Sequence, residues 1–563
     1  MKKQSYRHAL LLTIAIALGT VLRFTNLELK PPWSDEWATL VFSLGNSFLT
    51  VPIDQVIDLD SLLSPLQLQS TTGVSDVVNN LLTESTHPPL YFVITHGWLQ
   101  LFAGNEGLVS LWWGRALTAF LGVATIPAIF GLSWLLFHSL VTAQITALLM
   151  AISPLGVNLA QEARHYTLAI LWIIASLACL TVAIRCLQEK KSLGIFVIFI
   201  WIVVNCLGVA THYFFSLTLI AETLVLLIWW WQDFIKQQSR IFYKTWRRIY
   251  WAILGTIVGC IPWVIIWRSI PDNQLTSWVF AGNPLAEFYA PLSRLLLWII
   301  TMFALLPVEG VGDAIAICSV IIIIIFLVWA IPQLIKSFRF CQATESNELG
   351  IKIISRFLVV AIAFLLIITY IFGADLTLSA RFQFIYYPAV ILLLGMLLSF
   401  LANNLQQKKL LVVFVLIGFL GSLTVINNFA FQKVERPDLF VPIIIDSRKD
   451  VDSNVPILIA TRHKSHGQTG ELMSIGWQLQ KLKNNNQLNF LVQFLLAHQT
   501  GENEAQSNFK LKEMIQSFPR PFQLWLVNFS APDEILNDNC QREKIKKNKV
   551  TGYKLRLYSC GNN

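Results

Sequence analysis

Charged side chains are scarce in this sequence. Asp, Glu, Lys and Arg together make up 13% of the 563 residues, whereas soluble proteins contain about 25%. Hydrophobic residues make up 55%, and the mean hydropathy is +0.59. This balance excludes a water-soluble globular protein. The apolar residues occur in blocks of about 20, long enough as helices to cross ~30 Å of hydrocarbon, and they predict a polytopic α-helical membrane protein.

An extended basic surface and a signal-peptide cleavage site are also lacking. The net charge is +9, but the Lys and Arg residues form short clusters between apolar blocks, so nucleic acid is not expected as a partner. The first apolar block is followed by Arg23-Phe24-Thr25-Asn26, which contains no small-residue cleavage site. We therefore interpret this block as an uncleaved first span.

The basic clusters predict the topology. They are expected on the cytoplasmic side and occur at 2–7, 185–191, 236–248, 336–352 and 408–409. Two clusters on one side must be separated by an even number of crossings. Of thirteen apolar blocks, 88–103 and 291–307 break this rule and are expected to lie along the membrane interface. Eleven spans remain: 9–25, 114–137, 140–157, 166–184, 193–210, 213–231, 249–267, 313–333, 354–373, 382–402 and 408–428.

Two domains are expected. Residues 1–428 form the transmembrane module, with the amino terminus inside and 26–113 as the first outer loop. Residues 429–563 are expected outside as a small α/β domain, because short apolar runs alternate there with polar, helix-compatible stretches such as Leu472–Lys483. The apolar runs are Val441–Ile445, Val455–Ala460, Phe490–Leu496 and Phe522–Phe529.

Only two of the eight cysteines, Cys540 and Cys560, follow residue 341, and they bracket a basic, hairpin-like segment. Outside the cytoplasm they could form a disulfide, which would contribute ~3 kcal/mol by closing this loop. Two unpaired thiols are the alternative. The other six cysteines lie in or beside spans and are interpreted as packing residues.

A pair of adjacent carboxylates, Asp35 and Glu36, lies shortly after the first span and is flanked by Trp33 and Trp37. Ionisable groups at a membrane surface are costly to desolvate, which favours a functional role. The preceding Pro31-Pro32 restricts the backbone that delivers the pair. A solvated loop pair that only helps topology is the alternative.

Three further polar segments are expected on the same outer face. His87 precedes two prolines at the start of the first interfacial block, where it could simply cap a helix. Glu162, Arg164 and His165 lie in a tight turn between two spans, and a Glu162–Arg164 salt bridge is the alternative there. Arg381 begins the tenth span, where its guanidinium could hold a phosphate or merely snorkel to the interface.

Carboxylates, imidazoles and guanidinium groups on one face suit the transfer of a group from a lipid-linked phosphate. A carboxylate would take a proton from the acceptor hydroxyl, and cations would hold the departing phosphate. Glu162 and His165 could also join Asp35 or Glu36 around a divalent metal ion. No motif fixes a full set of metal ligands.

The acidic pair, the His87-Pro88-Pro89-Leu90-Tyr91 segment, the turn that ends at Tyr166, and Arg381 together resemble membrane glycosyltransferases of the GT-C class. The group in question contains protein O-mannosyltransferases and the ArnT-like lipid A aminoarabinose transferases, with an RgtA/B/C/D-like bacterial branch. The resemblance covers roughly residues 5–400.

The resemblance implies an inner (plasma) membrane enzyme with its active site and carboxyl-terminal domain on the periplasmic side. It implies an inverting hexosyl- or pentosyltransferase that takes its sugar from a polyprenyl-phosphate donor. The acceptor would be a hydroxyl of a lipid, glycan or protein. Asp35 would be the catalytic base with Glu36 beside it, and Glu162 would shape the site or bind metal. We expect the substrate-binding residues to be His87, Arg164, Tyr166 and Arg381.

Two other functional classes compete with the enzyme. A transporter or flippase of a lipid-linked sugar would have similar hydropathy, but it should show repeated halves and charged or broken segments near the membrane centre. In this chain no halves match, and the ionisable residues lie at the ends of the spans. A scaffold that merely displays the tail would leave the acidic pair and the polar turn without a purpose.

Overall fold

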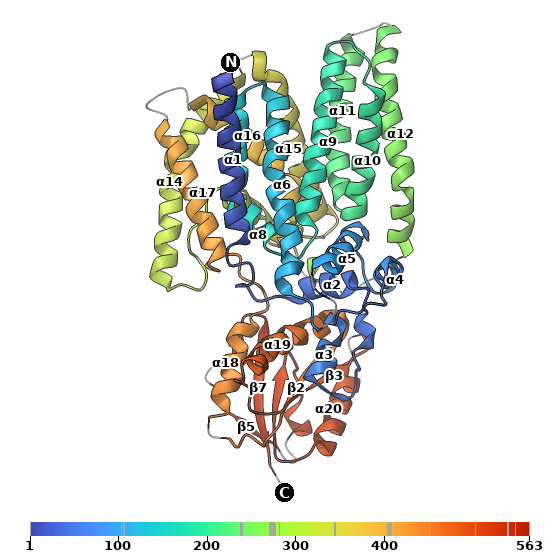
Figure 1. The fold of residues 1–563 in the computed structure, drawn as a ribbon, viewed down its shortest axis with the longest axis vertical. Coiled ribbons are helices and arrows are strands. Elements are labelled where there is room, and N and C mark those ends of the chain that lie inside the picture. Colours follow the sequence, from blue (N-terminus) through green and yellow to red (C-terminus); the bar gives the residue numbers. More distant parts are fainter. Residues whose placement is uncertain are drawn as a thin grey trace. The chain divides into compact units, whose positions relative to one another are not determined.

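Long apolar helices dominate the first of the two compact units in the computed structural model of this chain (Figure 1). Unit 1 comprises Met1–Leu29, Ser85–Tyr91 and Arg115–Gln432, and unit 2 comprises Lys30–Glu84, Phe92–Gly114 and Lys433–Asn563. The structure describes residues 2–102, 104, 107–236, 240–269, 277–280, 282–342, 345–401, 408–449, 451–501, 503–536, 540–545 and 548–561.

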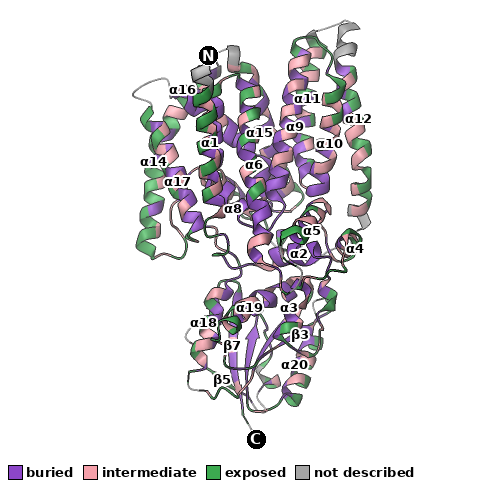
Figure 2. Ribbon diagram, in the orientation of Figure 1, coloured by how far each residue is buried: buried purple, intermediate pink, exposed green. Residues whose placement is uncertain are grey.

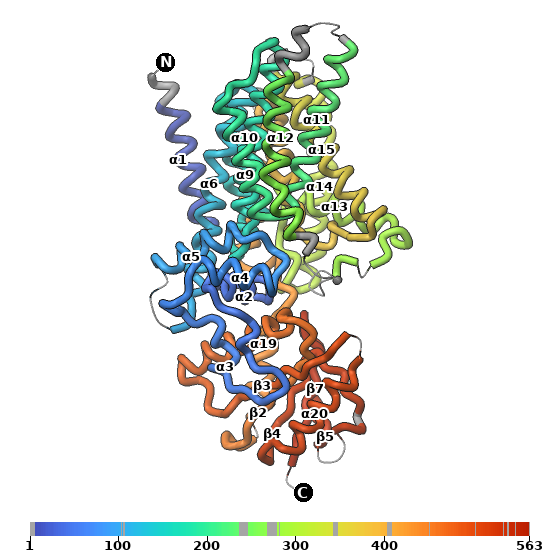
Figure 3. The backbone as a smooth tube through the Cα atoms, turned by 90° about the vertical axis from the view of Figure 1, so that its right-hand side faces the viewer, coloured from blue at the N-terminus to red at the C-terminus, as the bar shows by residue number. Residues whose placement is uncertain are grey.

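The helices of the bundle follow the apolar blocks of the sequence. They are α1 (Lys2–Phe24), α6 (Leu111–Phe137), α7 (Leu140–Ala151), α8 (Pro154–Ala160), α9 (Tyr166–Gln188), α10 (Ile195–Thr211), α11 (Phe215–Lys236), α12 (Arg240–Ser269), α14 (Asp313–Gln342), α15 (Glu345–Ile371), α16 (Tyr387–Leu401) and α17 (Lys408–Ile426). Figure 3 shows α9, α10 and α12 running side by side.

By length and composition, eight helices of the described residues could cross a membrane, or nine if the bent pair α7–α8 is one span. Two expected spans, 193–210 and 382–402, form the shorter helices α10 and α16, of 17 and 15 residues. Counting these two with the nine gives the eleven expected from charge and parity, and that number stays a prediction. The chain is a multi-pass membrane protein.

Apart from the bent pair α7–α8, the two blocks assigned to the interface form the shortest helices that the apolar blocks of the described residues give, at 13 residues each. These are α5 (Leu90–Phe102) and α13 (Tyr289–Thr301). At 1.5 Å per residue, each is about 20 Å long, whereas the hydrocarbon core is ~30 Å thick. Their length agrees with the expected interfacial position.

The expected span 140–157 is broken after α7, and the two pieces meet at 55°. Pro154 has no amide hydrogen to continue the helix, and Ser153 caps α8 by accepting a hydrogen bond from the Gly156 amide. The carbonyls left free at the end of α7 are bonded by Arg23 of α1. Its guanidinium donates to the oxygens of Met150 and Ala151, at 2.9 Å each.

Much of α12 and α14 is exposed (Figure 2), and many of the exposed residues on these helices are apolar. Only 11% of the most apolar part of α12 and 17% of that of α14 are buried within the chain. Their exposed residues include Trp251, Ile257, Ile261, Ile317, Ile325 and Val328. Such continuous apolar faces are stable only against lipid or a partner.

Unit 2 is built on one mixed sheet with the strand order β1-β3-β2-β4-β7-β5. Strands β2 (Ile457–His463), β3 (Val492–His498) and β4 (Phe522–Val527) are parallel, and helices α19 (His466–Asn484) and α20 (Ala505–Ser517) connect them. Strand β1 (Val56–Asp58) belongs to the first loop and pairs antiparallel with β3. The domain beginning near residue 429 therefore folds together with part of the 26–113 loop.

One of the four apolar runs expected as tail strands was wrongly assigned. Val441–Ile445 lies in helix α18 (Pro437–Ser447), in which Phe440, Val441 and Ile444 are buried. These three positions have helical spacing and share one buried face, so this short apolar run is part of a helix and not a strand. The other three runs overlap β2, β3 and β4, and Leu472–Lys483 lies within α19.

The expected disulfide is confirmed. Cys540 in β5 (Cys540–Glu543) and Cys560 in β7 (Tyr553–Cys560) lie directly opposite each other in an antiparallel pair and are bonded. The bridge joins an edge strand to its neighbour and closes the hairpin-like segment between them.

Candidate active site

The polar turn between α8 and α9 lies inside unit 1 rather than in solvent. Gln161, Glu162, Arg164 and His165 are all buried, with exposed fractions of 6% or less. The Gln161 amide donates to the backbone oxygen of Thr25, at 2.8 Å. The end of the first span therefore holds this turn, and its ionisable groups are fixed at the end of the bundle.

Arg164 connects this turn to His87. Its guanidinium donates to Nε2 of His87 at 3.1 Å. Because arginine can only donate, Nε2 accepts, and the His87 proton is on Nδ1, 3.2 Å from the Ser85 hydroxyl. The structure thus brings together two residues that are 77 positions apart in the chain.

Two further imidazoles lie beside this pair. The ring centroid of His165 is 5.4 Å from that of His87 and 4.5 Å from that of His212. His212 follows α10 directly and was not among the expected site residues. We call His87, Arg164, His165, His212 and Arg381 the cationic cluster.

The surroundings of His165 and His212 disfavour the charged form of both rings. Burial lowers the pKa of His165 well below the usual value, and the neighbouring His212 and Arg164 lower it further. Burial likewise lowers the pKa of His212, and His87, Arg164 and Arg381 act in the same direction. The fixed positive charges are thus the two guanidinium groups. A site with one buried and one half-buried guanidinium, beside imidazoles whose charged form is disfavoured, favours an anion.

Arg381 approaches the cluster from a different segment. It lies in the short helix η4 (Ala380–Ile385), and its guanidinium carbon is 5.3 Å from the ring centroid of Trp278 and 5.5 Å from that of Phe382. Stacking on aromatic rings fixes the plane of the guanidinium. Arg164 lies over an aromatic ring in the same way, with its guanidinium carbon 5.8 Å from the ring centroid of Tyr166.

Glu162 accepts a hydrogen bond from the Asn158 amide, at 3.4 Å. Among the residues that the structure describes, no three His, Cys, Asp or Glu side chains are grouped as a metal ion would require. Among these residues, Glu162 and His165 are therefore not part of a three-ligand set, and the expected metal site stays a prediction.

The acidic pair belongs to unit 2. Asp35 and Glu36 are in the first turn of α2 (Ser34–Ser43), where carboxylates are stabilised by the helix dipole. Glu36 is fully buried and Asp35 is partly exposed. Asp35 also lies near His466 of α19: burial lowers the pKa of His466 to about 4, and the charge of Asp35 opposes this shift.

A carboxyl group from the tail caps the helix that carries Asp35. Glu435 accepts hydrogen bonds from the Ser34 amide at 3.1 Å and the Ser34 hydroxyl at 2.6 Å. Ser474 of α19 donates to Glu435 at 3.2 Å and accepts from the Trp37 indole at 2.9 Å. Trp33 at the N-cap position offers no capping side chain, so Glu435 takes that place.

We expect Glu435 to make unit 2 less stable as the pH rises. Burial, with the nearby Glu471, raises the pKa of Glu435 to about 8 from an ordinary value of 4.5. Between these values the folded state binds the extra proton, so its stability falls as the pH increases. The stability of Glu435→Gln relative to that of the wild type should therefore increase as the pH is raised from about 5 to about 9.

Thermal unfolding of the intact protein in detergent at several pH values measures this difference. Glu513→Gln, which changes a glutamate on the exposed side of α20, is the matched control. A difference between Glu435→Gln and the wild type that stays constant across this pH range would contradict the prediction.

The sequence contained a signal for His212 but not for Glu435. His212 separates two apolar blocks, as the Glu162–His165 turn does, and such a position could have been included. Glu435 is an ordinary acidic residue about 400 positions after Ser34, and no local pattern indicates that they meet.

No protein-family model matches the chain, and no curated protein matches its sequence. The similarity to known proteins lies in the three-dimensional structure. The apo crystal structure of ArnT from Cupriavidus metallidurans matches 99% of this chain and 98% of its own, with a TM-score of 0.50 and 11% sequence identity. The chain has the ArnT fold. The expected fold class, a helical GT-C-type membrane module with a small carboxyl-terminal α/β region, is confirmed.

Two further similar structures have TM-scores below 0.5. The oligosaccharyltransferase AglB from Archaeoglobus fulgidus, in complex with an inhibitory peptide and a dolichol-phosphate, has a TM-score of 0.45 at 10% identity, over 84% of this chain and 64% of its own. The arabinofuranosyltransferase AftD from Mycobacteria has a TM-score of 0.45 at 13% identity, over 99% and 40%. The fold assignment rests on the ArnT structure alone.

Proposed function

We propose that this chain is a membrane glycosyltransferase that takes a sugar from a polyprenyl-phosphate donor and transfers it to a hydroxyl group. The observation that carries the proposal is the cationic cluster of unit 1. Arg164 and Arg381 supply fixed positive charge, and the buried His165 and the half-buried His212, whose pKa values are lowered, lie beside them. This combination suits the phosphate of a lipid carrier, which enters from the bilayer.

In the proposed reaction, Asp35 takes the proton from the acceptor hydroxyl. The acceptor oxygen attacks the anomeric carbon, and the bond between that carbon and the phosphate oxygen breaks. The sugar is transferred with inversion, and polyprenyl phosphate leaves with the electron pair. Arg164, which is held by its hydrogen bond to His87, and Arg381 stabilise the negative charge that grows on the phosphate.

Three further points belong to the proposal. The site and unit 2 face the periplasmic side of the inner membrane, as the basic clusters of the sequence indicate. The transferred group is a hexose or a pentose, and the acceptor is a lipid, a glycan or a protein. ArnT, whose fold this chain shares, has been crystallised bound to undecaprenyl phosphate, which agrees with a donor of this class.

A transfer assay distinguishes the enzyme from a flippase. The purified chain in proteoliposomes is given a polyprenyl-phosphate sugar labelled in the sugar, together with an extract of envelope lipids and glycans. We expect label in the acceptor and an equal amount of free polyprenyl phosphate. Movement of the intact donor across the bilayer without loss of its sugar would instead support the transporter.

A further inference from the structure

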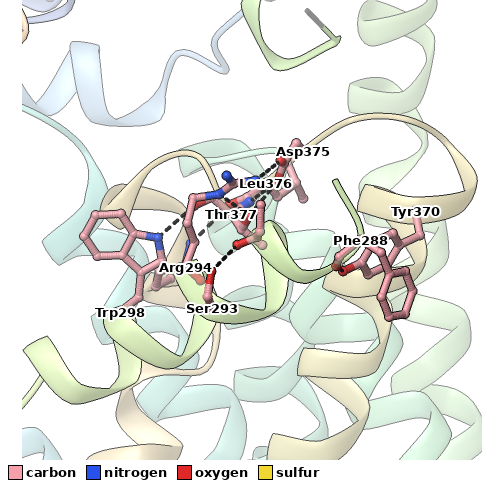
Figure 4. A network of polar contacts seen from close by, with 10 residues as sticks. Phe288, Ser293, Arg294, Trp298, Tyr370, Asp375, Leu376 and Thr377 are labelled. Atoms are coloured by element: carbon pink, nitrogen blue, oxygen red, sulfur yellow. Dashed lines mark hydrogen bonds and ion pairs between the residues drawn. The ribbon is translucent and has the colours of Figure 1, made fainter. Parts of the chain in front are cut away.

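The loop that leads to Arg381 is held by an ion pair whose carboxylate is buried. Arg294 of α13 donates from its terminal nitrogen to Asp375 at 2.5 Å and from Nε to the Thr377 hydroxyl at 3.1 Å (Figure 4). The Asp375 side chain is 4% exposed and that of Arg294 is 28% exposed. One guanidinium thus contacts two residues of the same short loop.

The loop folds around the Asp375 carboxylate. Its other oxygen accepts from the Thr377 amide at 2.9 Å and from the Thr377 hydroxyl at 2.6 Å. Trp298, also on α13, donates to the Thr377 backbone oxygen at 2.8 Å. Because Asp375 is buried, losing Arg294 would leave a carboxylate without its charge partner, which is strongly unfavourable.

The same loop is hydrogen-bonded to two segments next to Arg381: the one that contains Trp278, and η4, which contains Arg381 itself. The Asp375 amide donates to the backbone oxygen of Val279, at 3.0 Å. Val279 is next to Trp278, one of the two rings on which Arg381 stacks. In η4, the side-chain amide of Gln383 donates to the backbone oxygens of Leu376 and Ser379, at 3.1 and 2.9 Å. The ion pair therefore fixes the segments on both sides of the guanidinium.

We propose that Arg294 and Asp375 are positioning residues for donor binding, because they hold Arg381 and its aromatic support in the orientation that receives the phosphate. This inference rests on the proposed function. It also gives a role to the charge on α13, because Arg294 fastens the loop that precedes Arg381.

The test measures donor KM and kcat separately, with a polyprenyl-phosphate sugar as the probe. Asp375→Asn keeps the shape but loses the charge, and Arg294→Lys keeps the charge but cannot contact both partners. Both should raise donor KM about tenfold, with a smaller change in kcat. The reversed pair Arg294→Asp/Asp375→Arg should recover part of the loss. Glu348→Gln, which breaks the exposed Lys352–Glu348 pair of α15, is the control and should change nothing.

A second comparison separates positioning from general stability. In an Arg381→Ala background, Asp375→Asn should raise donor KM no further, because the group that it positions is gone. An unchanged donor KM in folded Arg294→Lys or Asp375→Asn would overturn the inference while leaving the proposed function intact. If Asp375→Asn does not fold, Arg294→Lys decides alone. An unchanged donor KM in Arg381→Ala would instead contradict the phosphate site itself.

Discussion

Asp35→Asn should reduce turnover by about 10²–10⁴-fold, because removing a positioned general base typically has an effect of this size. The substitution keeps the shape of the side chain in the first turn of α2. It removes a favourable interaction with the helix dipole that is worth only ~0.3–1 kcal/mol, so folding should survive. Steady-state transfer at saturating donor measures the loss.

Two matched substitutions distinguish Asp35 from the other candidate bases. Glu36→Gln changes the neighbouring carboxylate, which is fully buried in unit 2, and should be milder. Glu162→Gln changes the buried carboxylate of unit 1 and should also be milder if it only shapes the site. Near-normal turnover in Asp35→Asn would remove the base assignment, whatever the other two variants do.

Arg381→Ala should weaken donor binding by about 10- to 100-fold, the loss expected when a hydrogen bond to a charged group is removed. The donor affinity of Arg381→Lys should lie between those of Arg381→Ala and the wild type. This substitution keeps the charge but loses the bidentate fork and the stacking on Trp278 and Phe382. Direct binding of polyprenyl phosphate in detergent measures the change.

Arg356→Lys is the matched control, because Arg356 also stacks on an aromatic ring, that of Trp229, but lies outside the cationic cluster. It should leave donor binding unchanged. If Arg381→Ala and Arg356→Lys both bind polyprenyl phosphate as the wild type does, snorkelling and ring stacking account for Arg381 without a donor phosphate.

The sequence by itself determined the helical membrane module, because about 20 consecutive apolar residues have one stable conformation in hydrocarbon. Parity predicted that blocks 88–103 and 291–307 do not span, and they form the short helices α5 and α13. The same local reasoning located the polar turn before α9 and the cysteine pair of the tail. It failed at Val441–Ile445, where a run of five apolar residues is compatible with either a strand or a buried helix.

Only the tertiary structure decided which of these segments meet. His212 joins His165, Glu435 caps the helix of Asp35, and Arg294 holds the loop before Arg381. Strand β1 of the first loop also completes the sheet of the tail. Hydropathy and spacing act over one or two helical turns, whereas these contacts join residues between about 50 and 440 positions apart and depend on how packed helices and paired strands share a surface.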